Sequence, residues 1–254
     1  MMNEIIISPQ ELMYLAVKLG AVEFFGLPDP FMGMTPEEIR TSLDEAQLSL
    51  DQKGYAQMDF SGDFQIESTV ESLVRTCAFC SGCISVDRFR DGESVRLLAY
   101  VLEDHSVVLS QASGLLRLSA CAMQQARELL AEAAGGISDE TVFSPVRMEY
   151  EQLNELRAAL AAGGQDVPAD ASQRCEETLR AILADGFGGK SDFALLLAMG
   201  FEGRRTDSMM LLRTAAGSAC VVQGDDGGWM IRPAARQAML DWIDGALRDY
   251  QREA

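Results

Sequence analysis

The chain has 254 residues, is 48% hydrophobic and carries a formal net charge of −18 at pH 7. The length allows a substantial core, and the negative charge disfavours contact with nucleic-acid phosphates or anionic lipid. No apolar stretch approaches the roughly 18 residues of a membrane span, the N-terminal residues lack signal-peptide features, and six cysteines are too few for a disulfide scaffold. We therefore expect a cytoplasmic protein with reduced thiols that binds neither nucleic acid nor membrane.

Two helices are predicted near the N-terminus, and a capping box with proline at the first helical position opens each of them. The first follows Ser8-Pro9-Gln10-Glu11 and ends at Gly20. The second follows Thr35-Pro36-Glu37-Glu38 and ends at Gly54.

The segment 21–34 between these helices is expected to be a loop, because it contains two prolines and two glycines. It also carries five large apolar residues, namely Phe24, Phe25, Phe31, Met32 and Met34. Either these side chains dock onto the core, or some of them stay exposed as an adaptable contact surface, a role that Met suits. We therefore treat them as candidate partner-binding residues.

A strand at residues 55–60, a turn at 61–63, a strand at 64–66 and a third helix running towards Cys80 are predicted next. Helix, helix and hairpin in this order outline a winged helix, a module that commonly binds DNA. Residues 1–66, however, contain three basic and eleven acidic residues, whereas a DNA-binding surface needs Lys and Arg. A protein-docking or purely structural role is therefore favoured.

The remaining chain is predicted to form two β-meanders, each closed by a helix. The first meander has strands at 83–90, 95–102, 106–111 and 115–118, with a turn at Asp91-Gly92 and a helix from about Ser119 to Ala134. A Gly-rich linker at 135–139 then divides the chain into an N-terminal half, 1–136, and a C-terminal half, 137–254, which we expect to form one compact unit. The second half has predicted strands at 142–148, 192–201, 209–213, 219–223 and 229–232, helices at 150–162 and 172–185, and a closing helix with Pro233 in its first turn.

The strongest pattern is a β-β-β-α unit that occurs twice. A shift of 114 positions places residues 94–133 under residues 208–247 without a gap, with seven identities in 40 positions. Val107 and Val108 fall under Val221 and Val222, and the turns and helix starts coincide. We therefore expect an α+β fold of antiparallel meanders with packed helices and a pseudo-two-fold internal duplication. The alternative is two unrelated meander–helix units.

The spacing Cys77-x-x-Cys80-x-x-Cys83 places three soft metal ligands within seven residues. A fourth ligand would have to be His105 or Cys121, and no second Cys-x-x-Cys follows. Because these cysteines span a helix end and a strand start, where small buried residues are needed, we interpret them as structural and expect no metal.

No other motif builds an active site. His105 is the single histidine and lies in a predicted hairpin turn, where an exposed side chain is expected. Gly188-Gly189-Lys190-Ser191 ends like a phosphate-binding loop, but position 184 is Ala and a helix precedes it instead of a strand. We therefore expect no catalytic residue and no cofactor, and we predict that the protein is not an enzyme.

The chain resembles the EspG family, cytosolic chaperones of type VII (ESX) secretion. The features that carry the resemblance are Glu11-Leu12, Leu15-Ala16 and Leu19-Gly20 in the first helix, Leu27-Pro28 after it, Leu50 with Lys53-Gly54, and Gly227-Gly228-Trp229 with Pro233. The resemblance covers nearly the whole chain and implies an acidic, pseudo-two-fold α+β protein that holds secreted helical-hairpin substrates until export. No binding residue of the family is carried over.

Two functions follow from these patterns. The first is a non-enzymatic cytosolic chaperone or adaptor that binds a helical secreted partner. The second is an acidic winged-helix-containing regulatory or metal-sensing protein that uses Cys77, Cys80 and Cys83.

Overall fold

The computed structural model describes residues 4–21, 24–59, 64–90, 93–135, 137, 141–161, 177–187, 192–200, 207–224 and 227–253. The first half contains β1 Glu4–Ile7, α1 Pro9–Lys18, α2 Pro36–Gln52, β2 Ala56–Met58, β3 Phe64–Ile66, α3 Ser68–Ala78, β4 Gly82–Arg90, β5 Glu93–Leu102, β6 His105–Ala112, β7 Leu115–Cys121 and α4 Met123–Ala134. The second half contains β8 Val146–Met148, α5 Tyr150–Ala161, α7 Glu177–Phe187, β9 Asp192–Gly200, β10 Asp207–Thr214, β11 Gly217–Gln223, β12 Trp229–Pro233 and α8 Arg236–Glu253.

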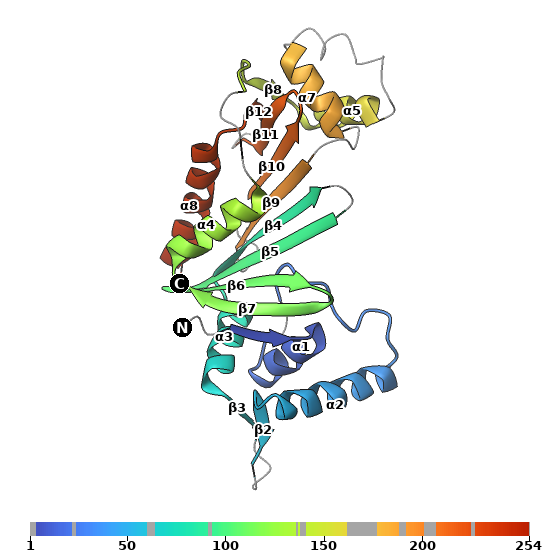
Figure 1. Ribbon diagram of the computed structural model, residues 1–254, viewed down its shortest axis with the longest axis vertical. Coiled ribbons are helices and arrows are strands. Elements are labelled where there is room, and N and C mark those ends of the chain that lie inside the picture. Colours follow the sequence, from blue (N-terminus) through green and yellow to red (C-terminus); the bar gives the residue numbers. More distant parts are fainter. Residues whose placement is uncertain are drawn as a thin grey trace.

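Ten strands form one antiparallel sheet in the order β1-β7-β6-β5-β4-β9-β10-β11-β12-β8, while β2 and β3 form a separate hairpin. The two halves of the chain meet where β4 pairs with β9, from Gly82 opposite Gly200 to Phe89 opposite Phe193. Figure 1 shows an elongated molecule with this pairing near its middle. The predicted α+β fold with antiparallel meanders is confirmed.

The order of elements in the first half repeats in the second. The series β4-β5-β6-β7-α4 corresponds to β9-β10-β11-β12-α8, and the edge strands β1 and β8 lie at opposite ends of the sheet. A helix follows each edge strand, and another helix, α3 or α7, precedes each central strand. The duplication therefore extends beyond the predicted β-β-β-α units, and its pseudo-two-fold axis passes between β4 and β9.

The shift of 114 positions used in the sequence alignment differs by two residues from the separation of the equivalent hairpin turns in the structure. The β5–β6 turn is residues 103–104 and the β10–β11 turn is residues 215–216, so these turns are 112 positions apart. A difference of two residues leaves a side chain on the same face of its strand. Val108 in β6 and Val222 in β11 accordingly pack against the same core, and the predicted equivalence of their strands is confirmed.

The two closing helices begin later than the sequence predicts. Ser119 belongs to β7, which pairs with β1 and β6, and α4 begins only at Met123. Pro233 is the last residue of β12 and lies opposite Ala219, and α8 begins at Arg236. Pairing with a neighbouring strand satisfies the backbone groups of these residues, which a local helix-start pattern cannot reveal.

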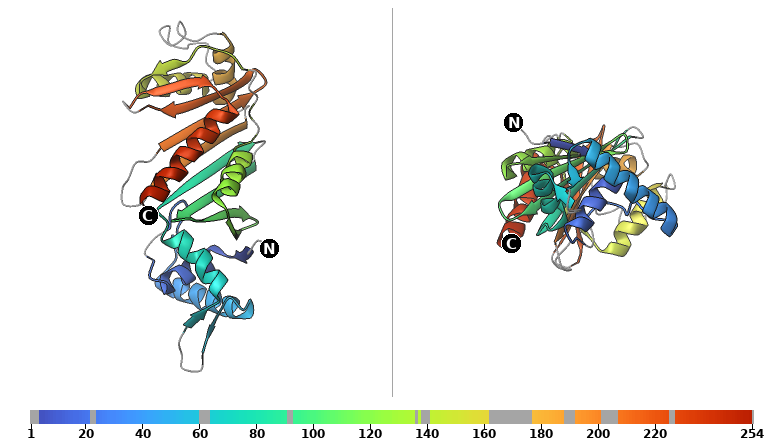
Figure 2. Two further views of the ribbon diagram at one scale, coloured as in Figure 1. Left: turned by 90° about the vertical axis from the view of Figure 1, so that its left-hand side faces the viewer. Right: turned by 90° about the horizontal axis from the view of Figure 1, so that it is seen from below.

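The two faces of the sheet are covered by different helices. On one face α4 and α8 lie side by side over the central strands, as Figure 2 shows in its left view. On the other face α1 and α3 cover the β5–β7 end, and α5 and α7 cover the β10–β11 end. Each of these three helix pairs encloses its own buried apolar cluster.

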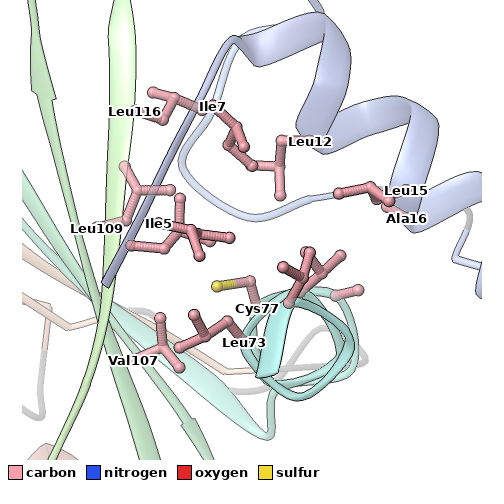
Figure 3. Close-up of a cluster of buried hydrophobic side chains, with 14 of the residues drawn as sticks. Ile5, Ile7, Leu12, Leu15, Ala16, Leu73, Cys77, Val107, Leu109 and Leu116 are labelled. Atoms are coloured by element: carbon pink, nitrogen blue, oxygen red, sulfur yellow. The ribbon is translucent and has the colours of Figure 1, made fainter. Parts of the chain in front are cut away.

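The N-terminal helices share a core with the large sheet and do not form a separate winged-helix module. Figure 3 shows Leu12 and Leu15 of α1 and Leu73 of α3 directed towards Ile5 of β1 and Leu109 of β6. All five side chains are at most 4% exposed. The predicted element order of residues 8–66 is therefore present, but its apolar faces are buried against the ten-stranded sheet.

Glu11 joins the two N-terminal helices. It closes the capping box of α1 with Ser8, and its carboxylate also accepts hydrogen bonds from Lys53 Nζ at 2.7 and 2.8 Å. Burial raises the pKa of Glu11, but hydrogen bonds from Lys53, Ser49 and Ser8 outweigh that effect and hold the pKa below its ordinary value. The start of α1 and the end of α2 are thereby fixed to each other.

Several predicted turns and loops lie outside the described residues. These are the turns at 61–63 and 91–92, linker residues 136 and 138–139, and residues 188–191.

A charged cluster lies beside the β4–β9 pairing, on the face covered by α4. Asp192 of β9 accepts hydrogen bonds from Arg88 of β4 at 2.6 and 2.9 Å and from Arg213 of β10 at 2.8 and 3.2 Å. Arg213 also donates to the carbonyl of Ala134 at the C-terminus of α4. One carboxylate therefore ties three strands and a helix end together, with side chains that are 10–22% exposed.

We predict that Asp192→Asn lowers the free energy of unfolding by about 2–3 kcal/mol, because two largely buried guanidinium groups lose their counter-charge. Burial raises the pKa of Asp192, but the hydrogen bonds from Arg88 and Arg213 bring it below its ordinary value. The charged pairing therefore stabilises the fold above pH about 4 and is lost as pH falls through the lowered pKa. Denaturant unfolding at several pH values measures both effects.

Glu71→Gln is the matched control, because its ion pair with Arg75 has side chains that are 41% and 50% exposed. It should change stability by less than about 0.5 kcal/mol. Equal effects of the two substitutions would contradict a structural role for Asp192.

Candidate functional site

The loop between α1 and α2 is attached to the sheet at Phe25 and Gly26. The buried Tyr100 of β5 donates its hydroxyl to the Phe25 carbonyl at 2.7 Å, and Arg96 donates to the Gly26 carbonyl at 3.3 Å. Gly26 has φ +72°, and a Cβ placed there would lie 2.2 Å from Leu98 Cδ2. Only glycine permits both this conformation and this close approach.

The five apolar residues predicted as a partner surface divide into two groups. Phe24 and Phe25 are half-buried and pack against the core that α1 and α3 enclose. Phe31 is half-buried, Met34 is 37% exposed and Met32 is 78% exposed. The start of the loop therefore docks onto the core, whereas its end presents an exposed apolar surface.

A groove of about 590 Å³ lies between α1, this loop and α2. Its lining residues are Met13, Tyr14, Val17, Lys18, Phe24, Leu27, Asp29, Phe31 and Leu43. We call it the α1–loop groove. Phe24 and Phe31 thus line one apolar depression, to which α1 and α2 also contribute.

A second apolar surface, which sequence reasoning did not identify, lies on the sheet itself. Its apolar residues are Phe89 of β4 and Phe193, Leu195 and Leu197 of β9, and we call it the central face. The same face carries Asp87 of β4, which lies opposite Leu195 and forms an ion pair with Arg96 of β5. Phe89 is 46% exposed and stacks on Phe193 with ring centroids 5.1 Å apart. Leu195 and Leu197 are half-buried and belong to none of the three buried clusters.

The central face lies between the two helix pairs of its side of the sheet. Among the described elements, α3 packs on β5, β6 and β7, and α7 packs on β10 and β11, whereas α4 packs on β9 from the opposite side. Along β9, half-buried residues alternate with buried ones, because successive side chains point to opposite faces. In the sequence this strand is a continuous apolar run, so the pattern does not show which of its two faces is less buried.

The cysteine cluster forms part of a core. Cys77, Cys80 and Cys83 are free and at most 2% exposed, and Figure 3 shows Cys77 among apolar side chains. Burial raises the pKa of all three thiols, and it raises that of Cys80 to about 12. Within the described ranges, no three His, Cys, Asp or Glu side chains are placed to hold a metal ion.

Of the remaining candidates, only His105 lies within the described residues. His105 is exposed at the start of β6, beside the turn. Lys190 and Ser191 lie outside the described residues. In the part of the chain that the structure describes, no helix combines the length and apolar character that a membrane span needs.

The fold defines a class of α+β proteins in which one long antiparallel sheet joins two similar halves. No protein-family model and no curated protein matches the sequence. Among solved structures, the type VII secretion system chaperone EspG5 of Mycobacterium tuberculosis, in complex with a PE25–PPE41 dimer, is similar with a TM-score of 0.69. The match covers 96% of each chain at 12% sequence identity, so it shows a shared fold.

We predict that Cys77, Cys80 and Cys83 of the native protein resist alkylation by iodoacetamide at pH 8, because buried thiols with raised pKa values form little thiolate. Cys121 is only half-buried and should react faster. Mass spectrometry of the labelled peptides measures the order, and full labelling after denaturation is the control. Rapid native labelling of the cluster would contradict its role as core.

Cys80→Ala should lower the free energy of unfolding by about 1 kcal/mol, through packing alone.

Proposed function

We propose that the protein is a non-enzymatic cytoplasmic chaperone or adaptor that holds a helical, secreted partner protein. The observation that carries the proposal is the central face, where Phe89, Leu195 and Leu197 lie beside the Asp87–Arg96 ion pair in the middle of the sheet without a covering helix among the described elements. The fold shared with a chaperone whose structure contains a protein dimer supports a protein partner.

The architecture of this face supports a helix as the element of the partner that binds there. A sheet buries an apolar face by packing a second layer against it. On one side of β4 and β9 that layer is α4 and α8. A helix of the partner, about 10 Å across with its side chains, would form the matching layer on the central face, between the α1–α3 and α5–α7 pairs.

The alternative of a metal-sensing regulator gains no support from the site. The three cysteines are buried in a core that also contains Leu73 and Val107. The helix in the recognition position, α2, carries five acidic residues and one arginine, which opposes contact with DNA phosphates.

We predict that Phe89→Asp abolishes partner retention while the fold persists. A charge at a half-exposed position would weaken an apolar contact severely and affect the monomer little. The matched control is Val95→Asp on β5. Val95 is 52% exposed and pairs with Arg88, so it projects from the opposite face of the same region of the sheet.

The measurement is tagged purification from the native cell, followed by mass spectrometry and circular dichroism of the retained protein. The unchanged protein and Val95→Asp should retain the same helical protein in stoichiometric amount, and Phe89→Asp should lose it at an unchanged melting temperature. Equal retention by both variants, or a partner without helical structure, would contradict the proposal.

A further inference from the structure

The α1–loop groove is separate from the central face. Gly26 packs towards the sheet, against Leu98 and Met199, whereas Phe31 lines the groove on the α1 side of the loop. Phe24 and Leu27 belong to the groove and also to a smaller adjoining cavity of about 150 Å³ under the prolines of the loop. The loop therefore presents apolar surface towards α1 that the central face does not use.

This groove is open and mostly apolar. Val17 on its α1 wall is 59% exposed, and Met32, next to Phe31, is 78% exposed. Exposed apolar side chains around a depression of this size mark a binding surface more often than a feature of folding. The turn that presents Phe31 is well defined, because the Phe31 backbone N–H donates to Asp29 Oδ1 at 2.9 Å.

The charge around the groove identifies the kind of occupant. Residues 24–53, which form the loop and α2, contain six acidic and two basic residues, a net charge of 2 − 6 = −4. Of the two basic residues, Lys53 is engaged with Glu11. Asp29 lines the groove, and the negative charge of Asp44 reaches Tyr14 in its wall, where burial and that charge raise the pKa of the phenol.

Lys18 also lines the groove and keeps its positive charge, and its ammonium group lies 5.3 Å from the ring centroids of both Tyr14 and Phe64. Counted together with the loop and α2, it leaves a net charge of 3 − 6 = −3. An acidic segment would meet the carboxylates of Asp29 and α2, whereas a basic segment would be attracted by them.

We propose that the α1–loop groove binds a basic amphipathic helical segment, with apolar side chains inserted between Val17 and Phe31 and with Lys or Arg facing Asp29. A stripe of apolar side chains at i, i+3, i+4 spacing fits such a groove. The inference stands apart from the proposed function, because it concerns a different surface and needs no secreted partner.

The probe is a synthetic peptide of about 18 residues, or five helical turns, that has Leu at i, i+3, i+4 spacing and Lys elsewhere. The comparison peptide has Glu in place of Lys. Fluorescence anisotropy should show binding of the Lys peptide to the full chain, with affinity that falls as salt rises, and at least about tenfold weaker binding of the Glu peptide. Equal binding of both peptides would overturn the charge argument.

Two variants place the binding. The double variant Phe31→Ser, Met32→Ser should weaken Lys-peptide binding at least about tenfold. The single variant Val17→Ser should weaken it equally, and it keeps the proposal testable if the double variant lowers the melting temperature. Val142→Ser is the matched control, because Val142 is 80% exposed in the other half of the chain. If Val142→Ser weakens binding as much as Val17→Ser, the contact is unspecific and the proposal fails.

A third variant separates this inference from the proposed function. Phe89→Asp should leave Lys-peptide binding unchanged even though it abolishes partner retention. Loss of peptide binding in Phe89→Asp would place the peptide on the central face and overturn the assignment to the groove.

Discussion

The antiparallel pairing of β4 with β9 is the interaction on which the rest of the structure depends. It is the only strand pairing between the two halves among the described residues, and it makes two meanders into one sheet. Arg88, Asp192 and Arg213 fix one end of it to the C-terminus of α4. The same pairing brings Phe89 next to Phe193, so the central face exists only because the halves are joined. The proposed binding surface is therefore a property of the duplicated protein, and neither half contains it alone.

Acidic charge and exposed apolar surface complement each other in this protein. A net charge of −18 makes two copies of the chain repel each other, which opposes self-association through the central face or the α1–loop groove. A partner that is neutral or basic does not meet this repulsion. The chain can thus present Phe89, Leu195 and Met32 to solvent and still favour another protein over a second copy of itself.

Local patterns predicted most of the elements, because capping boxes, glycines and prolines act over a few residues. Ser8 with Glu11 and Thr35 with Glu38 open α1 and α2 as expected. The predicted ends of β7 and β12 were wrong, because the last residues of these strands pair with neighbouring strands. That pairing depends on residues far away in the sequence. The central face could not be predicted for the same reason. Leu195 becomes distinct from Leu196 only when α4 covers one face of β9 and leaves the other.

The separation of β4 and β9 along the chain has a consequence for synthesis. Strand β4 ends at Arg90 and β9 ends at Gly200, so 110 residues must be added before the central pairing is complete. At ribosomal rates of about 5–20 residues per second, this takes about 5–20 s. During that time β4 is an edge strand, and edge strands pair readily with other chains. Within a polysome, the unpaired β4 of one nascent chain can be met by the β9 of its neighbour, and two chains that complete each other's sheets in this way would form a domain-swapped dimer.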